Sequence, residues 1–396
     1  MPRSNPALAA QQPNPMFRIG ALVYGRDDIL HLEFGEPDFP TPAHIAAAAV
    51  TSIANERQGY GPGNGIAELR AAVAARVQRV NGYAPTAEQV VMTAGGTGGL
   101  MGSLLTLCAP GDVVLTPDPG WPGYDAMLAI AGVERAYYPL LPERGWLPDL
   151  DALEAAITPR TRVLLINSPS NPGGAVYPAE TIAALVEVAT RHDLWLLSDE
   201  CYDELVFDAR HISPASLDAN DADGRVLMVG SFSKTYAMTG WRIGWVVAPP
   251  AIAPALGLTT AAQINNLPLF VQRAALAALE GPQECVAEMR ASYQARRDLA
   301  MGLLRERGLL EYTPAGAFYL LIPVARAAGY GADEPFDTLA FAEALIAERG
   351  IALAPGMAFG SRTARYVRVS LASAPDVLRA GISGLLDFAT GWRTYR

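Results

Sequence analysis

From about residue 89, short apolar runs alternate with longer stretches in which apolar residues recur at helical spacing. The short runs have the length of strands and read QVVMTA, DVVLTP, RVLLIN, LWLLSD, RVLMVG and IGWVVAP. Helical patterns such as PDLDALEAAI and PAETIAALVEVATRH lie between them. Continuous apolar strands separated by helices are typical of a mostly parallel sheet that is buried on both faces. The pattern therefore predicts an α/β fold, with a large domain whose mostly parallel sheet is covered by helices on both faces.

The pattern changes after about residue 285. A long charged helical stretch, ECVAEMRASYQARRDLAMGLLRERG, is followed by AFYLLIP, by FDTLAFAEALIAERG and by ARYVRVSLA. A few separated strands among helices indicate a smaller α+β domain. We expect three parts: residues 1–42 as an N-terminal arm and part of the small domain, residues 43–284 as the large cofactor-binding domain, and residues 285–396 as the small C-terminal domain.

Composition narrows the classes of function. The chain has 396 residues, of which 51% are hydrophobic and 18% charged, so it can bury a large core. A net charge of -10 argues against nucleic-acid binding, which needs clustered Lys and Arg. Three separated cysteines and four scattered histidines indicate neither a disulfide framework nor a metal site, and they favour a reducing cytoplasm. The apolar region 240–258 contains an arginine and three prolines, which argues against a membrane span.

Polar groups follow four of the predicted strands. GGTGGL comes after QVVMTA, SPSNPGG after RVLLIN, DECYDEL after LWLLS, and SFSKT after RVLMVG. Ligands of open α/β sheets bind outside the carboxyl ends of the strands. We therefore expect these glycine, asparagine, aspartate and lysine residues to meet in a single polar site.

Each of these features also has a purely structural reading. The glycines at 95–99 precede a helix, where an anion such as phosphate binds well, but they also suit a tight turn. Asp199 ends a buried strand and needs a cation or donor, or it caps a helix. Lys234 is either a desolvated nucleophile or a solvated lysine, and Arg242 binds either a phosphate or a surface carboxylate. Taken together, a phosphate cradle, a nucleophilic lysine and an acid for a ring nitrogen fit pyridoxal 5'-phosphate.

Eight motifs in order, over nearly the whole chain, carry a family resemblance. They are GEPDFPTP, GYGPGNGIAELR, TAGGTGGL, NSPSNPGG, SDECYDELVFD, SFSKTYAMTGWRIGW, PAGAFYL and RYVRVSLA. With these motifs the sequence resembles the class I/II aminotransferases of pyridoxal-phosphate fold type I. It is most similar to the bacterial branch that holds aspartate-type and broad-specificity transaminases.

The resemblance implies roles around the cofactor. Lys234 would be the Schiff-base lysine and would later move a proton at the substrate α-carbon. Asp199 would pair with the pyridine nitrogen, and Tyr202 and Asn171 would hydrogen-bond the phenolic oxygen of the ring. Trp121 would stack on the ring, although ordinary packing is the alternative. The implied phosphate contacts are Gly96, Thr97, Gly98, Ser231, Ser233 and Arg242.

The resemblance also implies how substrate and subunits meet. Arg368 would hold the substrate α-carboxylate, assisted by Asn171 and the backbone of Gly35. Tyr60 would reach the phosphate in the neighbouring subunit, so we expect a homodimer with shared sites. Aspartate-type members carry a lysine where this chain has Thr97. A strict preference for aspartate is therefore in doubt, and a neutral, aromatic or basic substrate side chain is open.

The sequence thus predicts a cytoplasmic, pyridoxal-phosphate-dependent aminotransferase that moves the α-amino group of an L-amino acid to a 2-oxo acid by a ping-pong mechanism. Two other functions remain open at this point. The same cofactor chemistry supports β-elimination, as in cysteine-conjugate lyases of similar fold. A non-catalytic sensor is the third reading, but too few residues precede LEFGEPDF for a usual DNA-binding domain, and Lys234, Asp199 and Arg368 are all present.

Overall fold

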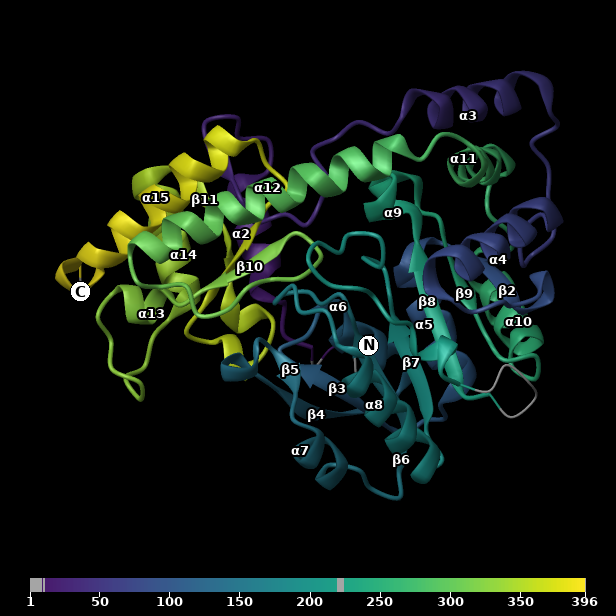
Figure 1. Cartoon of the computed structure of the whole chain (residues 1–396), viewed down its shortest axis with the longest axis horizontal. Helices are drawn as coiled ribbons and strands as arrows, with labels where there is room; N and C mark the ends of the chain where they lie inside the picture. Colours follow the sequence, from purple (N-terminus) through teal and green to yellow (C-terminus); the bar gives the residue numbers. More distant parts are fainter. Residues whose placement is uncertain (1–8, 10, 219–223, 396) are drawn as a thin grey trace, which may run out of the picture.

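The computed structural model describes residue 9, residues 11–218 and residues 224–395. The described part contains an eight-stranded sheet in the order β2-β9-β8-β7-β6-β3-β4-β5 (Figure 1). Neighbouring strands from β8 to β4 run parallel, whereas β9 is antiparallel to β2 and β8, and β5 is antiparallel to β4. The strands are β2 (Val90–Thr93), β3 (Val113–Asp118), β4 (Glu134–Leu141), β5 (Leu147–Pro148), β6 (Thr161–Asn167), β7 (Trp195–Asp199), β8 (Val226–Ser231) and β9 (Gly244–Val247).

Helices cover both faces of this sheet, as the apolar runs predict. Successive residues of β6 enter different cores: Leu164 and Ile166 lie in one apolar cluster, and Val163 and Leu165 in another. This alternation is the two-residue period of a strand that is buried on both sides. The helices are α3 (Ala43–Asn55), α4 (Ala67–Asn81), α5 (Gly95–Leu107), α6 (Gly123–Ala131), α7 (Leu150–Ala155), α8 (Ala179–Arg191), α9 (Phe232–Thr235), α10 (Ala253–Ile264) and α11 (Leu269–Glu280).

A second body joins the N-terminal segment to the C-terminal part of the chain. It contains a three-stranded antiparallel sheet, β10-β13-β12, and a short parallel pair of β1 with β11. Ile19 and Leu32 from the N-terminal segment share its core with Leu345 and Leu385. Its elements are α2 (Pro15–Val23), β1 (Leu30–His31), β10 (Tyr319–Ile322), α13 (Val324–Ala327), α14 (Thr338–Arg349), β11 (Ile351–Ala352), β12 (Ala354–Pro355), β13 (Val367–Ser370) and α15 (Pro375–Gly391).

One long helix, α12 (Glu284–Glu306), runs from the large sheet region to the second body (Figure 1). Near its start Val286 belongs to the core of the large sheet, whereas Met289 and Tyr293 belong to the core of the second body. The helix therefore joins the two cores, and the predicted domain limits at residues 42 and 284 stay predictions.

The prediction of a mostly parallel sheet is confirmed, but the sequence did not indicate β4 and β5 at one side, nor the antiparallel direction of β9 at the other. β9 is antiparallel to β8, and the connection between them, residues 232–243, contains α9 and a short 3-10 helix, Thr239–Trp241. β4 carries exposed and half-buried residues along most of its length, so it lacks a continuous apolar run. Within the described residues, no helix is both long and apolar enough to cross a membrane.

Candidate active site

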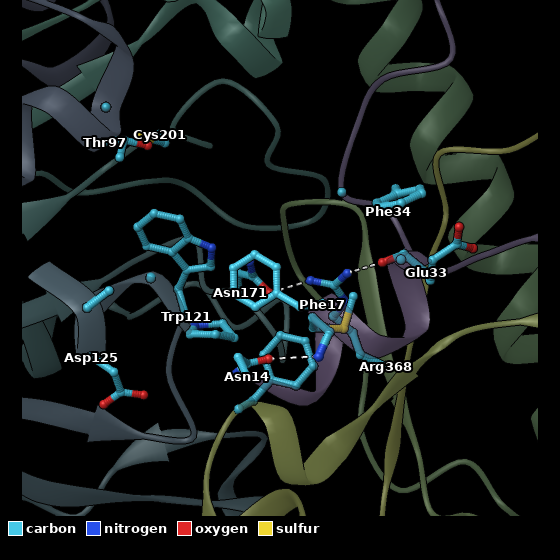
Figure 2. A pocket seen from close by; sticks show the side chains of 18 of the residues that line it. Asn14, Phe17, Glu33, Phe34, Thr97, Trp121, Asp125, Asn171, Cys201 and Arg368 are labelled. Carbon is cyan, nitrogen blue, oxygen red and sulfur yellow. Dashed lines mark hydrogen bonds between the residues drawn. The ribbon is translucent and has the colours of Figure 1, made fainter. Parts of the chain in front are cut away.

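A cavity of about 1170 Å³ lies between the carboxyl edge of the large sheet and the second body. Its walls come from the ends of β6, β7 and β8, from the start of α5, from residues 33–35 and from α2 (Figure 2). The predicted site residues that line it are Gly35, Gly96, Thr97, Trp121, Asn171, Asp199, Tyr202, Ser231, Ser233, Lys234, Arg242 and Arg368. Gly98 and Tyr60 do not line it.

Lys234 lies on α9, which begins directly after β8. Its Nζ donates a hydrogen bond to the carbonyl oxygen of Gly35 at 2.5 Å. Desolvation lowers the pKa of the Lys234 amine from 10.5 to about 8, and the nearby guanidinium groups of Arg368 and Arg242 act in the same direction. An amine with this pKa is partly uncharged near neutral pH and can act as a nucleophile. Lys234 is also the only lysine in the sequence.

Asp199 is the last residue of β7, and its carboxylate is buried at the cavity. Oδ2 accepts a hydrogen bond from the hydroxyl of Tyr124 at 2.9 Å, and Oδ1 accepts one from the backbone N–H of Cys201 at 3.3 Å. Burial raises the pKa of Asp199 above its ordinary value. Because both donors are neutral, this carboxylate can still bind a protonated ring nitrogen.

The start of α5 forms an anion-binding corner. The first backbone N–H groups of a helix have no partner within the helix, and no side chain caps this one. Gly95 has φ 71°, and a Cβ there would lie 2.8 Å from Nη2 of Arg242, so the glycine lets the guanidinium approach the helix start. The hydroxyls of Ser231 and Ser233 are 3.0 Å apart beside it. Unpaired N–H groups, two hydroxyls and a guanidinium together suit a phosphate.

Gly98 is not part of this corner, although the family resemblance implied that it contacts the phosphate. Its N–H donates to the carbonyl oxygen of Ala94 at 3.4 Å instead of pointing to the cavity. Thr97 does line the cavity, near Cys201 (Figure 2). The corner therefore depends on the residues before Gly98.

Arg368 lies on β13 and is 5% exposed. Nη1 donates to Oδ1 of Asn171 at 3.1 Å and Nη2 donates to the carbonyl oxygen of Glu33, so both described acceptors are neutral (Figure 2). The guanidinium lies between the rings of Tyr319 and Phe359, at 4.4 and 4.8 Å from their centroids. Desolvation lowers the pKa of Arg368 below its ordinary value, but arginine stays charged at neutral pH. A buried cation with neutral partners is suited to bind a carboxylate.

Two tyrosines of the cavity wall, Tyr202 and Tyr319, contact each other. The hydroxyls of Tyr202 and Tyr319 are 2.7 Å apart. A Cβ on Gly35 would lie 2.1 Å from the hydroxyl oxygen of Tyr319, so this glycine makes room for the tyrosine. Trp121 lines the same cavity and meets Tyr124 edge to face at 5.4 Å.

Several lining residues were not predicted from the sequence. Tyr319 stands in the quoted motif PAGAFYL, so it had a sequence signal. Tyr124, which bonds to Asp199 without lining the cavity, was not predicted either. Asn14 and Phe17 had no sequence signal. They line the cavity because α2 packs beside β12 and lies close to Arg368 (Figure 2). Tyr60 is 91% exposed and makes no contribution to this cavity within the single chain.

Comparison with known proteins gives the family. Residues 27–382 match the model of aminotransferase class I and II. The chain is 38% identical over 364 residues to an arginine–pyruvate transaminase of Pseudomonas aeruginosa, covering 92% of this chain and 90% of that protein. It is 37% identical to an aspartate/prephenate aminotransferase of Thermus thermophilus, covering 90% and 89%.

Solved structures agree with the sequence matches. The structure of Thermus thermophilus aspartate aminotransferase with maleate superposes with a TM-score of 0.89 at 34% identity, covering 98% of this chain and 100% of that one. An aromatic aminotransferase from Pyrococcus horikoshii gives 0.87 at 33% identity, covering 95% and 99%. These relatives favour transamination over the elimination and sensor readings. The chain belongs to the class I and II aminotransferases.

Proposed function

We propose that this aminotransferase binds pyridoxal 5'-phosphate in the cavity and moves the α-amino group of an L-amino acid to a 2-oxo acid. The observation that carries the proposal is the meeting, in one cavity, of the only lysine, a buried carboxylate with neutral donors and the uncapped start of α5. The cofactor supplies an aldehyde that condenses with amines and a ring that withdraws electrons from the substrate α-carbon.

Each part of the cofactor has a group of the chain to hold it. Lys234 would hold the aldehyde carbon, and Asp199 would accept a hydrogen bond from a protonated ring nitrogen. The start of α5, with Ser231, Ser233 and Arg242, would hold the phosphate. Tyr202 and Asn171 would bond the ring hydroxyl, and Trp121 would cover one face of the ring.

Lys234 would also be the group that moves a proton. Its unprotonated amine would take the proton from the substrate α-carbon and later return it. A pKa of about 8 suits a general base near neutral pH, because an appreciable fraction of the amine is unprotonated there. One site serves both the amino acid and the oxo acid, so the two half-reactions alternate in a ping-pong mechanism.

The charges of the cavity disfavour a substrate whose side chain carries a second carboxylate. The cationic side chains among its described lining residues are Lys234, Arg242 and Arg368, and each already has a proposed partner. The carboxylates of Glu33 and Asp125 also line the cavity, Asp125 in an ion pair with Arg135, and Thr97 carries no charge. A second substrate carboxylate would therefore have no cation from this chain, and an unpaired buried carboxylate is costly. The names of the relatives cover arginine, aspartate, prephenate and aromatic amino acids, so this preference rests on the cavity itself.

We further propose a homodimer in which Tyr60 of each chain reaches the cavity of the other. Tyr60 is 91% exposed in the single chain, and the large apolar side chains of Val50, Ile53 and Leu258 are also exposed. Contiguous patches of exposed apolar side chains often mark surfaces that bind another protein. The cytoplasmic location stays a prediction from the use of cysteine.

The test is the visible and near-ultraviolet spectrum of the protein loaded with pyridoxal phosphate, recorded before and after each L-amino acid, with Lys234→Ala as the control. We expect a yellow band that neutral amino acids convert to the pyridoxamine form and that a 2-oxo acid restores. Aspartate and glutamate should react at least tenfold more slowly. A protein that stays colourless would exclude the cofactor, and conversion by aspartate at the same rate would exclude the substrate preference.

A further inference from the structure

The turn that follows β7 sends its side chains in opposite directions. Asp199 and Tyr202 face the cavity, whereas Glu200 and Asp203 point into the protein and are 0% and 5% exposed. Two buried carboxylates so close together are expensive unless hydrogen bonds and counter-charges satisfy them. The partners of Glu200 and Asp203 therefore show which residues hold the turn in place.

Glu200 is satisfied from two other segments. Its Oε2 lies 2.7 Å from Nε2 of His211, and its Oε1 accepts from the hydroxyl of Ser213 at 2.7 Å. Asn81 at the end of α4 donates to Oε2 from 3.2 Å. The backbone N–H of Glu200 also donates to the carbonyl oxygen of Val229 on β8 at 2.9 Å. Both the side chain and the main chain of this residue are thus held.

Asp203 is held by a buried arginine. Arg76 of α4 is 1% exposed and donates from both Nη atoms to the two carboxylate oxygens of Asp203, at 2.5 and 2.8 Å. Its guanidinium packs over the ring of Trp245 at 5.2 Å. Asn81 donates to Asp203 at 3.1 Å as well as to Glu200, so it links the hydrogen bonds of the two carboxylates. We call Arg76, Asn81, Glu200, Asp203, His211 and Ser213 the buried carboxylate cluster.

No member of the buried carboxylate cluster lines the cavity. Stability alone does not explain it, because apolar side chains of similar volume often serve as well as a buried ion pair. Directional bonds do something that apolar packing does not: they fix the orientation of the groups that make them. Here the bonded residues, Glu200 and Asp203, each adjoin a residue that faces the cavity.

We propose that the buried carboxylate cluster is a positioning device, which fixes the turn so that the Asp199 carboxylate and the Tyr202 hydroxyl keep their places in the cavity. Glu200 and Asp203 are positioning residues and touch neither substrate nor cofactor. The part of this inference that concerns cofactor binding rests on the proposed function, whereas the rigidity of the turn does not.

The experiment compares wild type with Glu200→Gln, which keeps the shape of the side chain and removes its charge. The control is Arg297→Met, which removes another buried arginine that bonds to Asp208 and Pro314 away from the cavity. Amide hydrogen exchange of the cofactor-free proteins measures the rigidity of residues 199–205. Titration with pyridoxal phosphate gives its Kd, and the circular dichroism of its visible band reports the orientation of the bound ring.

For Glu200→Gln we expect at least tenfold faster exchange in residues 199–205, about a tenfold higher Kd for pyridoxal phosphate, and a weaker dichroism band. The KM for the amino acid should stay unchanged because Arg368 is not disturbed. Arg297→Met should leave the turn, the Kd and the band as in wild type. If Glu200→Gln does not fold, Ser213→Ala, which removes one donor to Glu200, should give about threefold changes in the same directions.

Wild-type exchange in the turn of the variant would overturn the inference, and so would faster exchange with an unchanged Kd. Equal effects in Arg297→Met would do so too, because they would show general destabilisation. If wild type itself does not bind pyridoxal phosphate, the proposed cofactor is wrong, and the exchange rates still decide whether the cluster fixes the turn.

Discussion

Lys234 and Arg368 are cations without a carboxylate partner among the described residues, and they face the same cavity. Desolvation lowers the pKa of both groups, so holding them there costs folding free energy. Such a cost persists in a protein when the groups serve a ligand. In the proposed function Lys234 would react with the cofactor aldehyde, and Arg368 would orient the substrate through its α-carboxylate.

The lowered pKa of Lys234 can be measured directly on the cofactor-free protein. Because the chain has no other lysine, an amine reagent such as trinitrobenzenesulfonate can label only this side chain and the terminal amine. The labelling of Lys234→Arg gives the contribution of the terminal amine, which is subtracted. We expect the labelling rate to rise with pH with a midpoint of about 8, since the unprotonated amine reacts and desolvation favours it. A midpoint near 10.5 would show that the amine is solvated.

Substitution of Arg368 by lysine keeps the positive charge and removes the planar fork. We expect kcat/KM for the amino acid to fall by about 10- to 100-fold, because one or more charge-assisted hydrogen bonds to the α-carboxylate are lost. The Kd for pyridoxal phosphate should not change. Steady-state kinetics and a cofactor titration check this, and equal losses in both quantities would place Arg368 at the cofactor instead.

Lys234, Asp199 and Arg368 could be predicted because each stands at a strand in a quoted motif with few alternatives. The partners of these residues could not. Tyr124 bonds to Asp199 across 75 positions of sequence, and Arg76 bonds to Asp203 across 127. Such pairs depend on how helices pack on the sheet, and a single sequence does not show this.

At the level of elements, the start of α5 would set how closely the phosphate of the proposed cofactor can approach. A Cβ on Gly96 would lie 2.5 Å from Sγ of Cys201, a contact that real side chains do not make. Relief of this contact would require the Cys201 side chain to rotate or the helix start to move. The absence of a side chain at Gly96 is therefore a requirement of the fold at this point.

For Gly96→Ala we expect a loss of about 1–3 kcal/mol in the free energy of unfolding and at least a tenfold rise in the Kd for pyridoxal phosphate, because the helix start must move. Gly302→Ala is the matched control: Gly302 lies within α12 with nothing within 4 Å of a Cβ, so alanine there should stabilise by about 0.5–1 kcal/mol. Chemical denaturation and cofactor titration measure both. Unchanged cofactor binding in Gly96→Ala would contradict the proposed phosphate corner.

The element pattern was predictable where apolar runs are continuous, as in β3, β6, β7 and β8. It failed for β4, whose side chains are partly exposed, and it did not show the antiparallel direction of β9. It also did not place α2 at the cavity, since the contacts of α2 with β12 and α14 join residues more than 300 positions apart. Local hydrophobic patterns predict whether a segment is a helix or a strand, but they do not show which distant segments it packs against.

At the scale of the whole molecule, the cavity lies between two cores that α12 joins, and the second body takes its parts from both ends of the chain. The site is thus assembled only when the N-terminal segment and the C-terminal part have packed together. Of the two predicted site residues that do not line the cavity, Gly98 and Tyr60, Tyr60 is the one that is 91% exposed in the single chain.

Subunit mixing tests the place of Tyr60. If Tyr60 acts in the partner's cavity, Lys234→Ala and Tyr60→Ala should each be weakly active alone, and a reassociated mixture should regain activity. In a mixed dimer the Tyr60→Ala chain supplies Lys234, and the other chain supplies Tyr60, so one of two sites is complete. Random pairing would then restore about a quarter of wild-type activity. No recovery in a mixture that light scattering shows to be dimeric would place Tyr60 outside the partner's site.

The only lysine of the chain stands in the cavity, which has a consequence for proteolysis. An endoprotease that cleaves after lysine can cut this chain at one bond only, between residues 234 and 235, directly after β8. That bond lies inside a four-residue helix packed beneath the cavity, so the folded protein should resist cleavage until this region opens. The appearance of two fragments, residues 1–234 and 235–396, would therefore time the opening of the active site.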